Sequence, residues 1–227
     1  MATPGTATRV ALLAGTTGLI GRSLLPLLLA DARYSAVHVL LRRAVPGIFP
    51  HPKLTLHTVD FSQLPAPFPA VDDVFVALGT TIKVAGSEAA FRRVDFDFVV
   101  NTARAARDGG ATRLAVVSAL GADARSRVFY NRVKGDMQAA DGALGYGSVV
   151  LAQPSLLIGD RAALGQPVRA GEVWATRLLG PFMGLVPRSV RPIQAGTVAK
   201  AMLAATFDAV PGVRLLSSAQ MQGSGQP

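Results

Sequence analysis

Short apolar runs alternate with longer segments of helical character along most of this chain. The runs are four to eight residues long and rich in Val, Leu and Ala, which is typical of parallel strands buried on both faces. We expect strands at Arg9–Ala14, Ala36–Leu41, Leu54–Val59, Val71–Leu78, Arg113–Ser118, Ser148–Ala152 and Val213–Leu216. We expect helices at Leu19–Ala30, Ser87–Arg107, Arg125–Ala140 and Ala195–Ala205. This alternation predicts an α/β fold, a doubly wound parallel sheet with helices on both faces.

The pattern loosens after residue 153. Gly and Pro recur through 154–192, which predicts loops and short helices on the substrate side, outside the sheet. We interpret residues 1–227 as one domain with this small C-terminal lobe, because the length suits a single core. Several large apolar residues in the lobe are available to line a pocket or an oligomer contact, namely Trp174, Leu178, Phe182 and Met183.

Composition narrows the chemistry. Half of the residues are hydrophobic and there is no cysteine, which excludes disulfides, thiolate catalysis and cysteine-based metal sites. The three histidines lack metal-ligand spacing, so we expect no metal. The net charge is +9 and 19 of the 23 cations are arginine, but these are scattered without interleaved aromatics. We therefore expect no nucleic-acid partner.

Membrane insertion and secretion are also disfavoured by the pattern. No apolar run reaches 18 residues, so we expect no membrane span. The apolar stretch near the N-terminus is broken by three glycines, and a strand, a glycine turn and a helix explain it better than a signal peptide. The expected location is cytoplasmic, as a monomer or a homodimer.

A glycine-rich turn connects the first expected strand to the first expected helix. It has the spacing GxxGxxG and consists of Gly15, Thr16, Thr17, Gly18, Leu19, Ile20 and Gly21. The three glycines would allow the tight turn, the close approach of a pyrophosphate and the packing of helix on strand. N–H groups at the helix start would then face the phosphates. The turn predicts a bound dinucleotide; the alternative is an ordinary turn whose glycines serve conformation only.

The end of the second strand indicates which dinucleotide is bound. Arg42 and Arg43 stand where an NAD-specific site usually places an acid for the ribose 2′-hydroxyl. Guanidinium groups suit a 2′-phosphate, because they can bind it through two parallel hydrogen bonds. The interpretation we favour is NADP(H); the alternative is two solvated surface arginines.

Three residues supply chemistry for such a cofactor. Tyr130 and Lys134 have i, i+4 spacing and share a helix face, while Ser118 ends the fifth strand. The carboxyl ends of strands are where ligands bind in open α/β sheets. Tyr130 would act as general acid in reduction and as base in oxidation, and the Lys134 ammonium would favour its phenolate form. Ser118 would hydrogen-bond and orient the substrate oxygen.

With these motifs in place, the chain resembles the short-chain dehydrogenase/reductases, in particular the atypical subgroup of HIV Tat-interacting-protein type oxidoreductases. The similarity runs from about Val10 to Ala205. It also rests on 76–81 (VALGTT), 93–95 (RVD), 117–122 (VSALGA), 130–134 (YNRVK) and Pro154.

The resemblance implies a Rossmann fold with bound NADP(H), and it implies roles for further residues. Asp60 and Phe61 would lie near the adenine, and Leu78, Gly79, Thr80 and Thr81 along the cofactor. Ser118, Tyr130 and Lys134 fall on the catalytic positions, the last two also touching the cofactor. Pro154, Ser155 and Leu157 would line the nicotinamide side.

Two positions depart from the pattern of the resemblance. Gln153-Pro154-Ser155 stands where family members often have Arg-Pro-Gly. Asp95 stands where related enzymes often carry an asparagine.

The sequence therefore predicts an NADP(H)-dependent oxidoreductase that interconverts a carbonyl and an alcohol on a small molecule. A hydrophobic carbonyl compound is the most specific substrate class it suggests. The alternative hypothesis is a dinucleotide-binding sensor or scaffold without physiological turnover.

Overall fold

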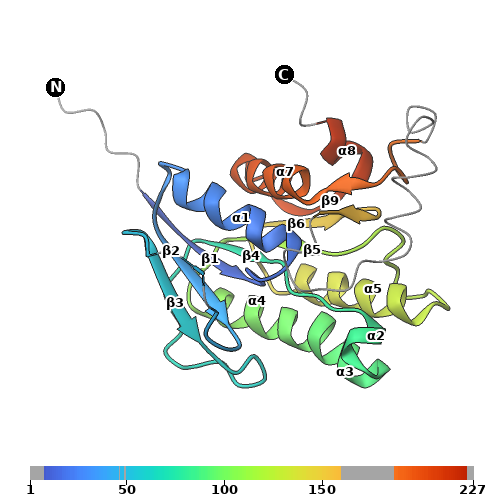
Figure 1. The fold of residues 1–227 in the computed structure, drawn as a ribbon, viewed down its shortest axis with the longest axis horizontal. Helices are drawn as coiled ribbons and strands as arrows, with labels where there is room; N and C mark the ends of the chain where they lie inside the picture. The colour runs from blue at the N-terminus through green and yellow to red at the C-terminus, as the bar shows by residue number, and fades with distance from the viewer. Residues whose placement is uncertain (1–7, 46, 49, 160–186, 224–227) are drawn as a thin grey trace.

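A seven-stranded parallel sheet with helices on both faces forms the centre of the molecule (Figure 1). The structure is a computed structural model and describes residues 8–45, 47–48, 50–159 and 187–223. The strand order is β3-β2-β1-β4-β5-β6-β9, and every neighbouring pair is parallel. The predicted doubly wound Rossmann-type α/β fold is therefore confirmed.

The sheet strands follow the apolar runs of the sequence. They are β1 (Arg9–Ala14), β2 (Tyr34–Leu41), β3 (Leu54–Thr58), β4 (Asp73–Val76), β5 (Arg113–Val117), β6 (Ser148–Gln153) and β9 (Gly212–Ser217). A separate two-stranded parallel pair joins β7 (Leu157–Ile158) to β8 (Ile193–Gln194). The helices are α1 (Leu19–Ala30), α2 (Ile82–Ala85), α3 (Glu88–Arg92), η1 (Arg93–Asp97, a π-helical turn), α4 (Phe98–Asp108), α5 (Phe129–Gly142), α7 (Ala195–Asp208) and α8 (Ser218–Gly223).

Two of the differences from the expected helices have local reasons. The helix expected over Ser87–Arg107 contains the π-helical turn η1 between α3 and α4, and apolar periodicity does not reveal such a bulge. The helix expected from Arg125 begins at Phe129. Before it, the Asp123 carboxylate accepts the Arg125 N–H and the Ser126 hydroxyl accepts the Val128 N–H. These short polar side chains favour turns over a helix start.

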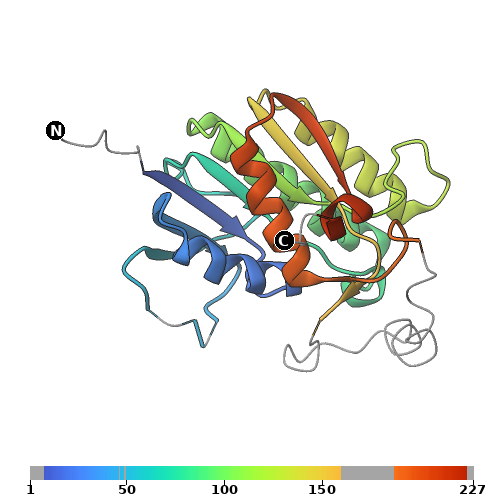
Figure 2. The same cartoon turned by 90° about the horizontal axis from the view of Figure 1, so that it is seen from above.

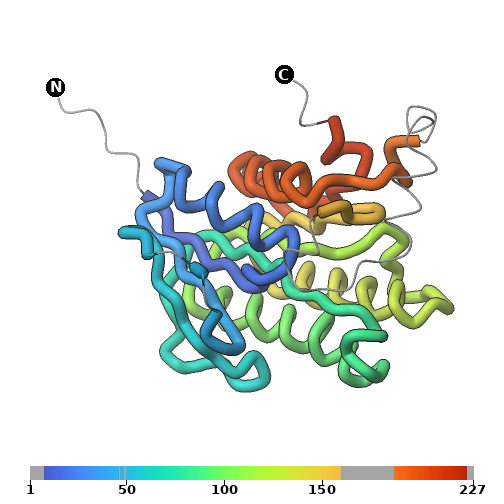
Figure 3. The backbone as a smooth tube through the Cα atoms, viewed as in Figure 1, coloured from blue at the N-terminus to red at the C-terminus, as the bar shows by residue number. Residues whose placement is uncertain are grey.

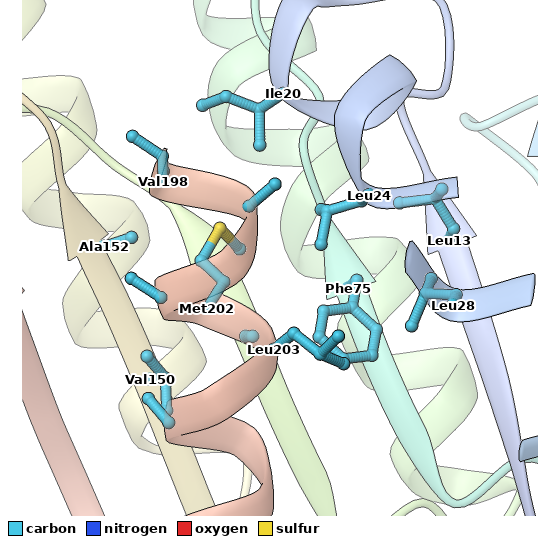
Figure 4. Close-up of a cluster of buried hydrophobic side chains, with 14 of the residues drawn as sticks. Leu13, Ile20, Leu24, Leu28, Phe75, Val150, Ala152, Val198, Met202 and Leu203 are labelled. Atoms are coloured by element: carbon cyan, nitrogen blue, oxygen red, sulfur yellow. The ribbon is translucent and has the colours of Figure 1, made fainter. Parts of the chain in front are cut away.

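Each face of the sheet has its own apolar layer. On one face, α1 and α7 lie side by side over the strands, as the two perpendicular views show (Figures 1 and 2). Figure 4 shows Leu24 of α1 and Met202 of α7 directed toward each other above Phe75 of β4. All three side chains are fully buried. The opposite face is covered by α4 and α5, with Val99 and Met137 in its core.

The amino edge of the sheet is held by a buried carboxylate. Asp73, at the start of β4, accepts two hydrogen bonds from the Arg9 guanidinium, at 2.8 and 2.6 Å, and one from the Tyr34 hydroxyl, at 2.9 Å. The Arg113 Nε atom lies 4.0 Å from the same carboxylate. Burial and the Asp73 charge raise the pKa of Tyr34, so its phenol stays protonated and donates. These contacts connect β1, β2, β4 and β5.

The expected substrate-side lobe falls largely outside the described residues. Residues 160–186 are among those the structure does not describe, and Trp174, Leu178, Phe182 and Met183 lie there. Of the stretch 154–192, the described part contains β7. The lobe and the single-domain boundary stay predictions.

Candidate cofactor and catalytic site

The site residues expected from the sequence gather at the carboxyl edge of the sheet. This edge contains the point where the strand order reverses, between β1 and β4. Ligands of open α/β sheets bind at such a point, because the connections leave it in opposite directions. The smooth tube in Figure 3 follows β1 into the glycine turn and α1, and β4 into α2 and α3.

The glycine turn is as compact as its spacing predicts. Gly15 has φ +96°, and a Cβ atom there would overlap the backbone of Ala77 and Leu78 after β4. A Cβ at Gly21 would overlap the backbone of Gly15, so the third glycine lets α1 pack on the turn. The Gly18 N–H donates to the Gly15 carbonyl at 3.0 Å. At Gly15 and Gly21 the turn requires glycine for steric reasons alone.

The start of α1 has the features of an anion site. Gly18 is the N-cap and, as a glycine, has no side chain to cap the helix, and the first turn carries no acid. The N–H groups of Leu19, Ile20 and Gly21 therefore lack a capping side chain, and the helix dipole adds partial positive charge. Beside them the buried Thr16 hydroxyl has no hydrogen-bond partner among the described residues. Together these groups fit a dinucleotide pyrophosphate.

A cavity of about 490 Å³ opens next to this turn. Its polar lining residues are Thr16, Thr17 and Arg22. The remaining lining is mostly apolar and comes from α1, the segment between β2 and β3, and the start of β3, including Leu25 and Ile48. Thr16 and Thr17 belong to the glycine turn, so the cavity borders the helix terminus that would hold phosphate.

Arg42 and Arg43 follow β2 directly and are both exposed. Neither forms a salt bridge with another residue of the described chain. Their position at the carboxyl end of β2 is where the sequence predicts a 2′-phosphate contact. The geometry leaves both guanidinium groups accessible to such an anion.

Asp60 and Phe61, expected near the adenine, follow β3. Asp60 is exposed, and its carboxylate accepts the Ser62 N–H at 2.8 Å. The Phe61 ring is buried and stacks on Phe98 of α4 with 5.7 Å between ring centroids. The Phe61 ring is thus part of the core, so a ligand near it would meet the backbone and Asp60.

The segment expected along the cofactor follows β4. Leu78 and Thr80 are half-buried and Gly79 is exposed. The Thr80 N–H donates to the Asp95 carboxylate at 2.8 Å, and the Thr81 hydroxyl caps α2 by accepting the Val84 N–H. Asp95, in η1, therefore fixes the backbone of this segment.

The same aspartate forms an ion pair with the predicted catalytic lysine. Lys134 Nζ lies 2.8 Å from Asp95 Oδ1, and both side chains are almost fully buried, at 4% and 1% exposure. Nζ also donates to the Val117 carbonyl at 3.4 Å. The direct contact explains the departure at position 95: a carboxylate neutralises the buried ammonium, which an asparagine at this place would not do.

Ser118 is anchored to the same helix by a residue the sequence analysis did not single out. Gln138 Nε2 donates to the Ser118 hydroxyl oxygen at 2.6 Å. The Ser118 N–H donates to the Ala152 carbonyl of β6, which continues the sheet pattern one residue beyond β5. Gln138 lies four residues after Lys134, so the spacing that marked Tyr130 and Lys134 could have identified it.

Tyr130 lies one turn before Lys134 on α5, in its first turn. Its ring is half-buried and contacts Phe91 of α3 with 5.3 Å between centroids. Tyr130, Lys134 and Gln138 thus form one stripe along α5, and the latter two contact the end of β5.

Gly135 explains how α5 comes so close to the loop after β5. A Cβ atom at this position would overlap the backbone of Asp123 and Ala124. The Asp123 N–H also donates to the Asn131 carbonyl at 3.0 Å. A side chain at position 135 would push the helix away and separate Lys134 from Asp95 and Val117.

Further along α5, Asp141 is fully buried, and neither of its carboxylate oxygens has a hydrogen-bond partner among the described residues. Burial raises its pKa to about 7, against the weaker opposing effect of the Lys134 charge.

The residues expected on the nicotinamide side serve partly to attach the C-terminal segment. The Pro154 carbonyl accepts the Leu120 N–H at 3.0 Å. The Ser155 hydroxyl donates to the Arg191 carbonyl and lies 2.9 Å from the Ser218 hydroxyl. Leu157 belongs to β7 and pairs with Ile193 of β8. Beyond it, a Cβ atom at Gly159 would overlap the side chain of Leu19, which places this segment against the start of α1.

Comparison with known proteins identifies the family. A family model described as NAD(P)H-binding matches residues 15–144, more than half of the chain. Among curated proteins, "Protein FMP52, mitochondrial" of Eremothecium gossypii is 32% identical over 218 residues, covering 93% of this chain and 95% of that protein. "Protein HTATIP2" of Rattus norvegicus is 33% identical over 196 residues, covering 83% and 77%. The expected family resemblance is confirmed.

Solved structures support the fold at lower identity. The structure of MoeE5 with UDP-glucose and NAD has a TM-score of 0.68 at 16% identity, covering 91% of this chain and 74% of that one. The Bordetella bronchiseptica enzyme WbmG with NAD gives 0.68 at 14% identity, covering 95% and 74%. Identities this low establish the fold and leave the choice between NAD and NADP open.

The comparisons correct one expectation. A cytoplasmic location is contradicted, because the FMP52 relatives are named mitochondrial. That expectation rested on the sequence showing no membrane span and no signal-peptide pattern, and neither observation excludes a mitochondrial location. Within the described residues, no helix is both long and apolar enough to cross a bilayer.

Proposed function

This chain belongs to the NAD(P)H-binding family, and we propose that it is an NADP(H)-dependent oxidoreductase that interconverts a carbonyl and an alcohol on a small molecule. The observation that carries the proposal is the stripe on α5. It places the Tyr130 phenol, the buried Lys134 ammonium and the Gln138 amide on one helix face, and the last two contact the end of β5. This end lies at the sheet edge where the glycine turn offers its N–H groups to a dinucleotide.

Ser118, Tyr130 and Lys134 each have a role in carbonyl reduction. The reduced nicotinamide supplies a hydride to the carbonyl carbon when the cofactor is bound. Ser118 donates a hydrogen bond to the substrate oxygen and holds it in place. Tyr130 transfers its phenolic proton to that oxygen, and in alcohol oxidation it takes the proton back. Lys134, fixed by Asp95, keeps a positive charge one helical turn from the phenol.

The choice of NADP(H) rests on Arg42 and Arg43. Both are exposed at the end of β2, and no acidic residue follows that strand directly. Two guanidinium groups there favour a 2′-phosphate over a free ribose hydroxyl. Arg22 and Thr17 line the nearby cavity and add polar surface on the same side.

Turnover is tested by following NADPH consumption with a panel of aldehydes and ketones of increasing apolar size. We expect at least one compound to be reduced, and Tyr130→Phe to lower kcat by roughly 10²–10⁴-fold, the usual contribution of a positioned general acid. NADPH affinity should stay within about twofold, because the ring and its Phe91 contact remain. The matched control is Tyr146→Phe, which removes a hydroxyl bonded to the Ala103 carbonyl of α4 in the core. Equal turnover by Tyr130→Phe would exclude its catalytic role, and tight NADPH binding without turnover on any compound would favour a sensor or scaffold.

The cofactor preference is tested by titrating NADPH and NADH and following nucleotide fluorescence. We expect tighter binding of NADPH and a loss of most of this preference in Arg42→Ala/Arg43→Ala, because the charges that distinguish the two ligands are gone. Arg214→Ala, on edge strand β9, removes the same charge elsewhere and should leave the preference intact. Stronger binding of NADH by the unmodified protein would refute the assignment.

A further inference from the structure

The side chain of Gln138 makes a short and directional contact at the proposed active site. Its Nε2 atom lies 2.6 Å from the Ser118 hydroxyl oxygen, and Ser118 is 4% exposed. Gln138 itself is half-buried. No other hydrogen bond to the Ser118 hydroxyl occurs within the described residues.

We infer that Gln138 is a positioning residue that sets the direction of the Ser118 hydroxyl, so that its hydrogen points to the oxygen of a carbonyl or alcohol substrate. The inference rests on the function proposed above and assigns a role to a residue outside the serine, tyrosine and lysine set. A hydroxyl has one hydrogen to donate and accepts through its lone pairs. When an amide N–H of Gln138 fills the acceptor side, the serine hydrogen is left for another acceptor.

The amide is suited to this task because of its polarity. A glutamate of the same shape could only accept when ionised, and it would draw the serine hydrogen toward itself. The serine oxygen would then face the substrate oxygen with its lone pairs, and the two acceptors would repel each other. Glutamine at position 138 thus selects the donor state of Ser118.

The backbone next to Ser118 is held from the same helix. Lys134, one turn earlier on α5, donates to the carbonyl of Val117. The Ser118 N–H is bonded to Ala152 of β6. With its backbone held on both sides, Ser118 has its hydroxyl rotation as the main remaining freedom, and that rotation is what Gln138 restricts.

Two substitutions separate polarity from packing. Gln138→Met keeps a similar volume and removes the donor, and we expect kcat to fall about 5- to 10-fold with KM little changed, the usual effect of losing one neutral hydrogen bond. Gln138→Glu replaces the donor with an acceptor, and we expect a loss of about 100-fold at pH 8, approaching that of Ser118→Ala. The Gln138→Glu activity should recover partly as the pH falls, because a protonated carboxyl can donate again. A role in packing alone would give no such recovery and would leave Gln138→Glu no worse than Gln138→Met.

A double-mutant cycle with Ser118→Ala tests whether Gln138 acts through the serine. In the Ser118→Ala background, Gln138→Glu should change kcat by less than about twofold, because the hydroxyl it directs is absent. Additive losses would overturn the inference. Gln222→Glu is the matched control: its amide donates to the Arg188 and Arg191 carbonyls near α8, so it should show no pH-dependent recovery of activity.

A measurement without turnover keeps this inference distinct from the proposed function. The side-chain amide hydrogens of Gln138 should exchange slowly with solvent by NMR in the unmodified protein and at least about tenfold faster in Ser118→Ala, where their acceptor is missing. Unchanged exchange in Ser118→Ala would show that Gln138 does not donate to Ser118 and would overturn the inference. Slow exchange that depends on Ser118, in a protein that reduces no carbonyl, would refute the proposed function and with it the substrate role of the serine.

Discussion

Two buried aspartates hold cations at opposite edges of the same sheet. At the amino edge, Asp73 accepts from Arg9 and Tyr34. At the carboxyl edge, Asp95 pairs with Lys134 and accepts the Thr80 N–H. Both carboxylates are essentially inaccessible to solvent, at 0% and 1% exposure, so the burial of the carboxylate does not distinguish the two clusters.

The two clusters differ in what their partners can still do. Around Asp73, the Tyr34 hydroxyl and the Arg9 guanidinium both donate to the carboxylate, and these hydrogen bonds join strands of the sheet. Around Asp95, Lys134 also reaches the carbonyl of Val117, beside a serine that still has a hydrogen to donate. A buried ion pair is therefore no sign of a site by itself. What matters is the unsatisfied donors around it and its location at the ligand-binding edge.

The largest effect we expect from this comparison is on stability at the amino edge. Asp73→Ala should lower the free energy of unfolding by roughly 3–5 kcal/mol, because Arg9 and Tyr34 lose a buried partner. Urea denaturation measures this loss. NADPH affinity per folded molecule should not change, since the proposed cofactor region is at the other edge. Asp208→Ala breaks the exposed pair with Arg214 and should cost under about 1 kcal/mol. A weakened NADPH affinity in folded Asp73→Ala would show that the two edges are coupled.

Asp141 is a third buried carboxylate, and unlike Asp73 and Asp95 it has no cation paired with it among the described residues. Its contribution to stability should therefore depend on pH. The pKa of Asp141 is raised to about 7 by burial, whereas in the unfolded chain it lies near 3.8. The folded state thus binds the proton more tightly, so its stabilising contribution is complete below about pH 4 and is lost as the pH rises through about 7. The full shift corresponds to about 4 kcal/mol.

Asp141→Asn imitates the protonated carboxyl and should remove this loss. We expect the variant to match the unmodified protein near pH 4 and to be up to about 4 kcal/mol more stable at pH 8. Urea denaturation at the two pH values measures the difference between the two proteins, in which all other titrating groups cancel. A constant difference at both pH values would mean that folding does not raise the pKa of Asp141.

At the carboxyl edge, Asp95→Ala should affect stability and turnover together. Lys134 would remain buried without its counter-ion, at a cost of about 3 kcal/mol. Turnover per folded molecule should fall at least about tenfold, because Lys134 is released and the Thr80 backbone loses its acceptor. Asp136→Ala removes a carboxylate on the same helix α5 that pairs with Arg92, which is 42% exposed, and should change neither property much. Full turnover in Asp95→Ala would separate this ion pair from the chemistry.

The sequence predicted the strands and glycine turn well because their signals are local. The limits of β1 and α1 coincide with the expected ones, since an apolar run, a glycine turn and a second apolar run leave few alternatives. The π-helical turn η1 was missed because it inserts into a helix without changing its composition. The late start of α5 was missed because two side-chain turns, at Asp123 and Ser126, compete with the helix.

Only the part of the candidate site that residue spacing and strand ends indicate could be predicted from the sequence. Tyr130 and Lys134 were found from their i, i+4 spacing, and Ser118 from its place at a strand end. That Asp95 contacts Lys134 directly depends on how η1 faces α5, across 39 residues of chain. The donor role of Gln138 depends on side-chain rotamers. Such contacts arise from tertiary packing, which no local pattern contains.

The smallest effect on stability comes from the loss of one tyrosine hydroxyl, and the two edges can be compared through it. Tyr34→Phe removes a hydrogen bond to Asp73 while keeping the ring against Phe75, so it should cost about 1–2 kcal/mol of stability and leave turnover unchanged. Tyr130→Phe should do the reverse, because its hydroxyl reacts and no hydrogen bond between it and the described residues would be lost. Thermal unfolding and NADPH consumption, measured on both variants, compare the stability and the turnover of each with those of the unmodified protein. If both hydroxyls affected stability equally and neither affected turnover, the carboxyl edge would be a structural cluster like the amino edge, and the distinction between the two would fail.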